Sequence, residues 1–203
     1  DYAVPIVTDS VISNNSSYGI YGEYGNGGIT IATSTISNNS GGGIILSGPK
    51  RAVTITNSTI TDNSGEGIYF HYARSGSSLT VTNNTISNNS GDGIYYSNSS
   101  IDYVSSPLPS ITYNTITGNS GNGVYLNGSH AVATINYNNL YENSGSYDLF
   151  SSVEDQAVDA RHNYWGLTST AIMGIATNPK NIPRIYDAHD NISYSIVNYS
   201  EWL

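Results

Sequence analysis

The sequence predicts an all-β fold, a right-handed parallel β-helix of about seven coils with a C-terminal cap. Three observations predict it. A short motif recurs along the chain, an alternating strand precedes most copies, and a glycine-containing turn follows them. The chain has 203 residues and no cysteine, so side-chain packing and backbone hydrogen bonds must stabilise it without disulfides.

The repeat begins as Ile-Ser-Asn-Asn-Ser-Ser-Tyr-Gly-Ile at residues 12–20. Later copies start at positions 36, 60, 86 and 116, and a degenerate copy starts at position 140. Successive starts are therefore 24, 24, 26, 30 and 24 residues apart. Such a period is too short for a propeller blade and fits one coil of a solenoid.

Strands are expected on both sides of the motif. Ile29-Thr30-Ile31 and Val53-Thr54-Ile55 alternate with period two, which places the apolar side chains inside and threonine outside. A second strand follows the glycine turn, as in Gly-Ile-Ile-Leu at residues 43–46. Because no segment before residue 165 has the spacing of a buried helix, neighbouring strands must pair between successive coils.

Stacking the coils predicts columns of equivalent side chains. One interior column contains Ile12, Ile36, Ile60, Ile86, Ile116, Leu140 and Trp165, and a second contains Ile20, Ile44, Ile68, Ile94, Val124 and Leu149. A buried ladder of amide side chains, each bonded to the next, is expected between them at Asn15, Asn39, Asn63, Asn89, Asn119 and Asn143.

The coil pattern resembles the right-handed parallel β-helix repeat proteins of the pectate-lyase-like group. The segment Val-Asp-Ala-Arg-His-Asn-Tyr-Trp-Gly at residues 158–166 resembles the closing segment of surface-located members. The resemblance implies an extracellular β-helix with coils over residues 1–165 and a capping segment of the same domain over 166–203. We expect a short helix at residues 170–176 and then an extended tail over the last coil. No activity is implied, because this fold carries many functions.

An aromatic file is expected on the outer face, one residue after each inward side chain of the second interior column. Its candidate binding residues are Tyr21, Tyr69, Tyr95, Tyr125 and Phe150, with Ile45 at the equivalent position of one coil. Exposed aromatic side chains often mark an interaction site, and they also stabilise sheets by packing across strands. Contact with a glycan, a protein interface and plain sheet stabilisation are therefore three open interpretations.

Acidic residues lie beside this file. Glu66 and Asp92 occupy the variable position of Gly-x-Gly in adjacent coils, and Asp62 lies one turn earlier. Neighbouring carboxylates of this kind are candidates for a calcium site, or for the acid and nucleophile of a glycosidase. The same position holds Gly42 and Asn122 in other coils, and the alternative interpretation is that two of the acidic residues are neighbours by chance.

Composition limits the partners. The chain has 15 acidic and 6 basic residues, which disfavours nucleic acid, and no apolar run is long enough to span a membrane. Sequons are consistent with a glycoprotein outside the cell; the candidate acceptors are Asn14, Asn38, Asn57, Asn83, Asn88, Asn98 and Asn127. The first coil is expected to stack on upstream coils or, head-to-tail, on a second copy.

The sequence thus favours a non-enzymatic extracellular β-helix used as a surface, structural or adhesion element, with a polysaccharide or other glycan as candidate partner. The alternative is a carbohydrate-active enzyme, a polysaccharide lyase or glycoside hydrolase, with Glu66 and Asp92 as its candidate catalytic residues. A further alternative is ice binding through two outward files that consist mostly of threonine. One file begins at Thr30, and the other begins at Ala32 and continues with threonine. No cofactor other than calcium is suggested.

Overall fold

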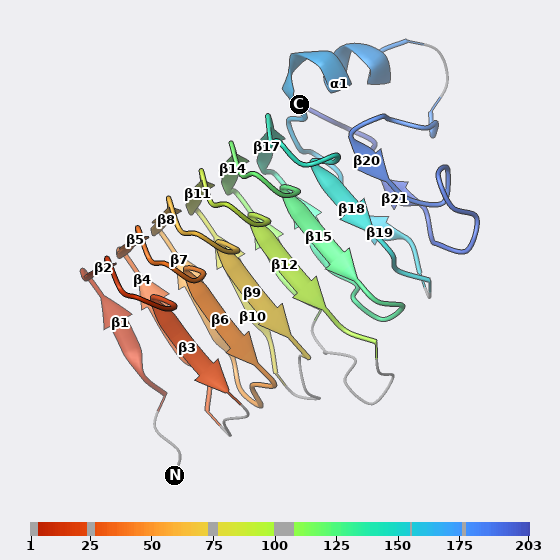
Figure 1. Ribbon diagram of the computed structural model, residues 1–203. Helices are drawn as coiled ribbons and strands as arrows, with labels where there is room; N and C mark the ends of the chain where they lie inside the picture. The colour runs from red at the N-terminus through yellow and green to blue at the C-terminus, as the bar shows by residue number, and fades with distance from the viewer. Residues whose placement is uncertain (1–3, 24–26, 73–76, 100–107, 155, 176–177) are drawn as a thin grey trace.

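The computed structural model describes residues 4–23, 27–72, 77–99, 108–154, 156–175 and 178–203. Over these residues the chain winds into a solenoid with three parallel sheets (Figure 1). Sheet A contains β1 (Ile6–Thr8), β4 (Ile29–Ala32), β7 (Val53–Thr56), β10 (Leu79–Thr82), β13 (Ser110–Thr112), β16 (Thr134–Asn136), β19 (Val158–Asp159) and β21 (Val197–Asn198).

The other two sheets complete each turn. Sheet B contains β2 (Val11–Ser13), β5 (Thr35–Ser37), β8 (Thr59–Thr61), β11 (Thr85–Ser87), β14 (Thr115–Thr117) and β17 (Asn139–Tyr141). Sheet C contains β3 (Ile20–Glu23), β6 (Ile44–Ser47), β9 (Ile68–His71), β12 (Ile94–Ser97), β15 (Val124–Asn127), β18 (Leu149–Ser151) and β20 (Ile185–Tyr186). The described residues therefore form about six full turns, and β19, β20 and β21 begin further ones.

The predicted interior columns are confirmed. Ile60 pairs with Ile36 on one side and Ile86 on the other, and all three side chains are fully buried. In sheet C, Ile68 pairs in the same way with Ile44 and Ile94. These columns form the core because each strand directs alternate side chains inward.

The predicted asparagine ladder is also confirmed. Each Asn donates its backbone N–H and its side-chain amide to Oδ1 of the Asn in the next turn, with Nδ2–Oδ1 distances of 2.8 to 2.9 Å. A second ladder, which we did not predict, lies at the corner between sheets A and B. Its members are Ser10, Ser34, Ser58, Asn84, Asn114, Asn138 and Asn163. Both ladders satisfy buried polar groups at a bend of the backbone.

Each full turn also needs a left-handed residue at two corners. Between sheets A and B, φ lies between 47° and 60° at Asp9, Thr33, Asn57, Asn83, Tyr113, Tyr137 and His162. Between sheets B and C, φ is also positive at Asn14, Asn38, Asp62, Asn88, Gly118 and Glu142. Asn, Asp and Gly tolerate this conformation best, which explains why they recur at these corners.

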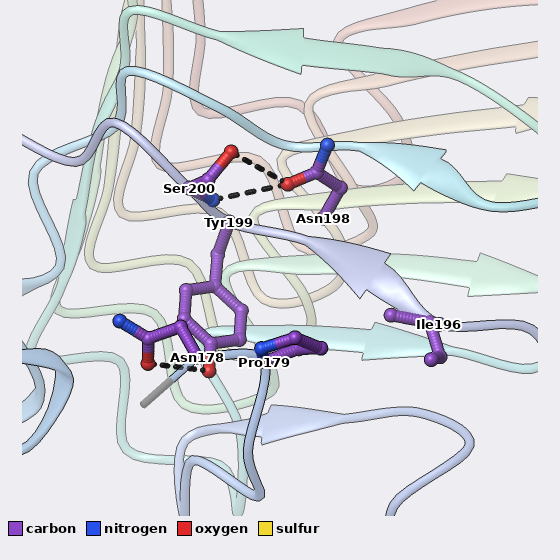
Figure 2. Close-up of a pocket in the computed structure, with 6 residues that line it drawn as sticks. All are labelled: Asn178, Pro179, Ile196, Asn198, Tyr199 and Ser200. Atoms are coloured by element: carbon purple, nitrogen blue, oxygen red, sulfur yellow. Dashed lines mark hydrogen bonds between the residues drawn. The ribbon is translucent and has the colours of Figure 1, made fainter. Parts of the chain in front are cut away.

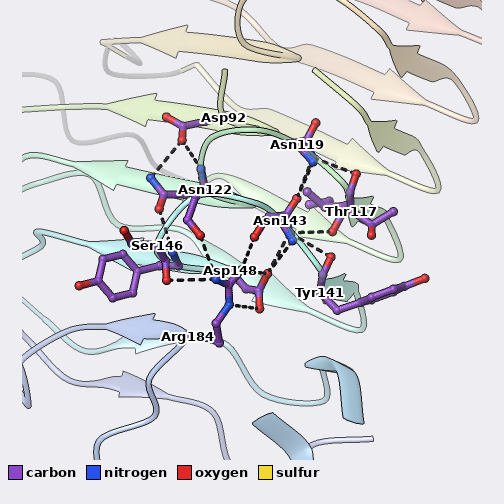
Figure 3. A network of polar contacts seen from close by, with 12 residues as sticks. Asp92, Thr117, Asn119, Asn122, Tyr141, Asn143, Ser146, Asp148 and Arg184 are labelled. Carbon is purple, nitrogen blue, oxygen red and sulfur yellow. Dashed lines mark hydrogen bonds and ion pairs between the residues drawn. The ribbon is translucent and has the colours of Figure 1, made fainter. Parts of the chain in front are cut away.

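The ladder ends at an ion pair (Figure 3). Asp148 Oδ1 accepts from the backbone N–H and the amide of Asn143, as the next Asn would. Arg184 donates to both carboxylate oxygens of Asp148 and to the carbonyl groups of Asn143 and Gly145, which would otherwise face the N–H groups of a next turn.

The C-terminal segment differs in detail from the prediction. The helix α1 spans Gly166–Met173 and not residues 170–176, because Gly166 turns the chain with φ +74° directly after Trp165. The residues that follow do not simply lie over the last coil, since β20 pairs with β18 and β21 pairs with β19 (Figure 1). Among the residues described, no helix is long and apolar enough to cross a membrane.

Candidate functional site

The predicted aromatic file lies on the outer face of sheet C. The strand register places all five predicted residues in one column, in which Ile45 lies between Tyr21 and Tyr69. The column continues at Tyr186 of β20, which we did not predict. Each follows an inward residue of the core, which turns its own side chain outward. We call its continuous part the aromatic stripe: Tyr69, Tyr95, Tyr125, Phe150 and Tyr186.

The rings of the stripe contact one another. Their centroids are 5.0, 4.9, 4.5 and 4.4 Å apart from one turn to the next. The side chains from Tyr69 to Phe150 are half-buried, so each ring is in contact with the next and part of it stays accessible to solvent. Such ring pairs stabilise the sheet by packing across strands, and they also form a surface that a partner can contact.

Tyr21 lies apart from the other four predicted residues. It is 58% exposed, and Ile45, which is only 9% exposed, separates it from Tyr69. Its ring stacks on Tyr18 at 5.9 Å, and its hydroxyl donates to Glu23 at 2.7 Å. The predicted file is therefore divided into a Tyr18–Tyr21 pair and the aromatic stripe.

Polar side chains flank the stripe on both sides. On one side His71, Ser97 and Asn127 share a column, and the Asn127 amide donates to the Tyr95 hydroxyl. On the other side lie Glu66 and Asp92. Burial, followed by neighbouring Tyr95, raises the pKa of Tyr69, so its hydroxyl stays protonated at neutral pH and can donate or accept a hydrogen bond.

Asp92 is held by the next turn of the solenoid (Figure 3). Its Oδ1 accepts from the backbone N–H of Asn122 at 2.5 Å and from the Asn122 amide at 3.0 Å. Burial is the main cause that raises the pKa of Asp92, and the negative charge of nearby Glu66 raises this pKa further. The two hydrogen bonds from Asn122 lower the pKa and so oppose the shift. One carboxylate oxygen is thus committed to a contact between turns.

Asp62 does not join these two acids. It occupies a left-handed corner with φ 57°, where its carboxylate accepts from the Thr61 hydroxyl at 2.9 Å. Across the residues that the structure describes, no three His, Cys, Asp or Glu side chains gather into a group that could hold a metal ion, and Asp62, Glu66 and Asp92 are all among those residues. The calcium candidates therefore do not form a site together.

The repeat geometry agrees with a known family. The family model of the right-handed β-helix region matches residues 1–106, which is just over half of the chain. The chain belongs to the right-handed β-helix family. No curated protein and no solved structure matches it significantly. The family confirms the predicted fold and its handedness, and no activity comes with it.

The sequons of this β-helix fall into two groups. Asn14, Asn38, Asn57, Asn83 and Asn88 are exposed, and all five occupy left-handed corners. Asn98 was a wrong candidate for the folded chain, because its side chain is fully buried and its amide donates to the His130 carbonyl at 3.3 Å. Asn127 is half-buried beside Tyr95.

Features near the C-terminal end of the β-helix escaped the sequence analysis. Tyr113, Tyr137 and His162 stack at a corner with centroid distances of 5.1 and 4.7 Å, and His162 contacts Glu201 at 3.0 Å. Their spacing of 24 and 25 residues was the available signal.

A pocket of about 260 Å³ is lined by Asn178, Pro179, Ile196, Asn198, Tyr199 and Ser200, with polar groups that bond to one another (Figure 2).

Proposed function

We propose that this protein is a non-enzymatic β-helix that contacts glycans through the aromatic stripe. One observation supports the proposal above all: five aromatic side chains lie in register on one outer face, between two columns of hydrogen-bonding groups. The apolar face of a sugar ring packs on an aromatic side chain, while its hydroxyl groups require polar partners beside that ring. The stripe and its flanks offer both.

The positions and hydrogen bonds of Glu66 and Asp92 support a binding role better than a catalytic one. A glycosidase needs one carboxyl group to deliver a proton and a second to act as base or nucleophile across the scissile bond. Asp92 instead uses Oδ1 to bond the next turn, and it shares one column with Glu66 on one side of the stripe. The enzymatic alternative is tested directly, because Glu66→Gln and Asp92→Asn would abolish sugar release from a polysaccharide.

The decisive experiment is affinity electrophoresis in gels that contain single soluble polysaccharides. We expect retardation of the wild-type chain in at least one gel and loss of retardation in Tyr69→Ala and Tyr95→Ala. Thr54→Ala and Thr80→Ala are matched controls, since they remove half-buried outward side chains from sheet A. Equal retardation of all four variants, or none for the wild type in any gel, would refute the proposal.

A second candidate, ice binding, is favoured by one observation on sheet A. Two outward files of mostly threonine lie in register, with Thr54 beside Thr80 and Thr56 beside Thr82. Parallel hydroxyl files on a flat sheet can order water. Thermal hysteresis of the purified chain tests this function, and a hysteresis that persists in Thr80→Lys would show that these files do not cause it.

A further inference from the structure

A cleft of about 730 Å³ lies between the last full turn of the solenoid and the start of α1. Its volume is within the range of small-molecule sites, about 300 to 1,000 Å³. The cleft is separate from the aromatic stripe, because no residue of the stripe lines it; its lining comes from β17 and the turn that follows, from residues 164–169 and from Arg184. The residues that the argument uses are Tyr141, Glu142, Tyr164, Trp165, Leu167 and Arg184.

The aromatic wall of the cleft departs from the repeat. Tyr141 follows Thr117 in its column, and Tyr164 pairs with Asn139 of β17. The two tyrosine rings lie 5.6 Å apart with an interplanar angle of 66°. In four earlier turns these two outward positions hold only hydroxyl side chains: Thr35, Ser37, Thr59, Thr61, Thr85, Ser87, Thr115 and Thr117.

The backbone at the cleft is also shaped for close approach. Gly166 follows Trp165 with φ +74°, and a Cβ atom at this position would lie 3.0 Å from Cβ of Tyr141. Trp165 is 1% exposed and lies among the lining residues, while Leu167 at the rim is 83% exposed. A local departure from the repeat rule that creates a lined cleft is more typical of a site than of a cap alone.

The charges at the cleft define the ligand class. All five N–H groups of Arg184 are used, by both oxygens of Asp148 and by the carbonyl groups of Asn143, Gly145 and Ser146. This guanidinium therefore has no donor left for an anion. Glu142 is exposed and offers a carboxylate acceptor, and no side chain caps the first N–H groups of α1.

We propose that this cleft binds a neutral saccharide of one or two rings. The sugar ring packs against Tyr141 and Tyr164, and its hydroxyl groups donate to Glu142 and accept from the first turn of α1. A phosphorylated or carboxylated ligand would meet Glu142 without a free cation to balance it. The proposal does not depend on glycan contact at the aromatic stripe.

Tryptophan fluorescence reports on this cleft. The chain has two tryptophans, so Trp202→Phe leaves Trp165, beneath the proposed ligand, as the only tryptophan, and its emission is followed under selective excitation of tryptophan. The probes are methyl glycosides of glucose, galactose, mannose and N-acetylglucosamine, with cellobiose and lactose. We expect a saturable change in Trp165 emission with at least one probe, and saturation transfer from protein to the same probe in NMR.

Variants locate the binding. Tyr164→Ala should weaken it at least about tenfold, because it removes one aromatic wall. Glu142→Gln tests the exposed acceptor without removing any packing and should also weaken binding. Tyr113→Ala is the control, since it removes an exposed tyrosine from another corner. Retained binding in Glu142→Gln and in a folded Tyr164→Ala, or no saturable response of the parent to any probe, would overturn the proposal.

Discussion

Arg184 should determine how firmly the solenoid is closed at its C-terminal end. In Arg184→Met the carboxylate of Asp148, whose side chain is 3% exposed, loses its counter-charge, and the carbonyl groups of Asn143 and Gly145 lose their donors. Removing one partner of a buried ion pair costs about 3 to 5 kcal/mol of unfolding free energy. We expect a loss of that size, measured by equilibrium unfolding in urea at neutral pH.

Two comparisons make this test specific. Asp148→Asn keeps an oxygen for Asn143 and removes the buried charge, so Asp148→Asn with Arg184→Met should be more stable than Arg184→Met alone. Arg161→Met breaks the Asp159 pair, in which both side chains are at least 34% exposed, and should lower the unfolding free energy much less than Arg184→Met does. Equal losses in Arg184→Met and Arg161→Met would refute the reasoning.

Three further predictions concern stability. Asn89→Ala interrupts the buried ladder and should cost about 3 kcal/mol in urea unfolding, whereas Asn15→Ala at its exposed end should cost less than about 1 kcal/mol; equal costs would contradict the ladder. Thr33→Asn relieves a β-branched residue at φ 47° and should raise stability by about 1 kcal/mol, measured by thermal melting; a lower melting temperature would contradict this. Burial raises the pKa of Asp92, so its destabilising effect is absent in acid and complete at pH above the raised pKa. Asp92→Asn should therefore raise the melting temperature near neutral pH and leave it unchanged below about pH 3, and the opposite dependence would exclude this cause.

Most of the solenoid was predictable because its pairing is set by repetition. Once Ile36, Ile60 and Ile86 are aligned by the motif, the register of sheet B follows, and the positions of sheet C follow from it. The second ladder was missed because its column begins with Ser10, Ser34 and Ser58 before asparagine appears at Asn84. A serine hydroxyl and an asparagine amide fill the same place in the ladder, although they differ in the sequence.

The C-terminal end was less predictable because pairing there does not follow the repeat. β20 and β21 contain two residues each, too few to show an alternating pattern, and they are recognisable only by their partners β18 and β19. Arg184 is remote in sequence from the Asn143 carbonyl that it contacts. The cleft was missed for the same reason, since Tyr141 lies in the degenerate copy of the motif and Tyr164 lies in the turn after it, which has no copy.

The fold itself explains why this chain carries many sequons. A left-handed corner favours asparagine, the next position holds the buried Ser or Asn of a ladder, and the third position holds an outward Ser or Thr. Asn83, Asn84 and Thr85 show this order, as do Asn38, Asn39 and Ser40. At these corners the asparagine therefore fits the backbone conformation whether or not a glycan is attached. In a host without N-glycosylation, Asn83→Gly should keep its stability within about 1 kcal/mol, because glycine tolerates the corner equally well. A large loss would show that the Asn83 side chain has a role beyond the turn.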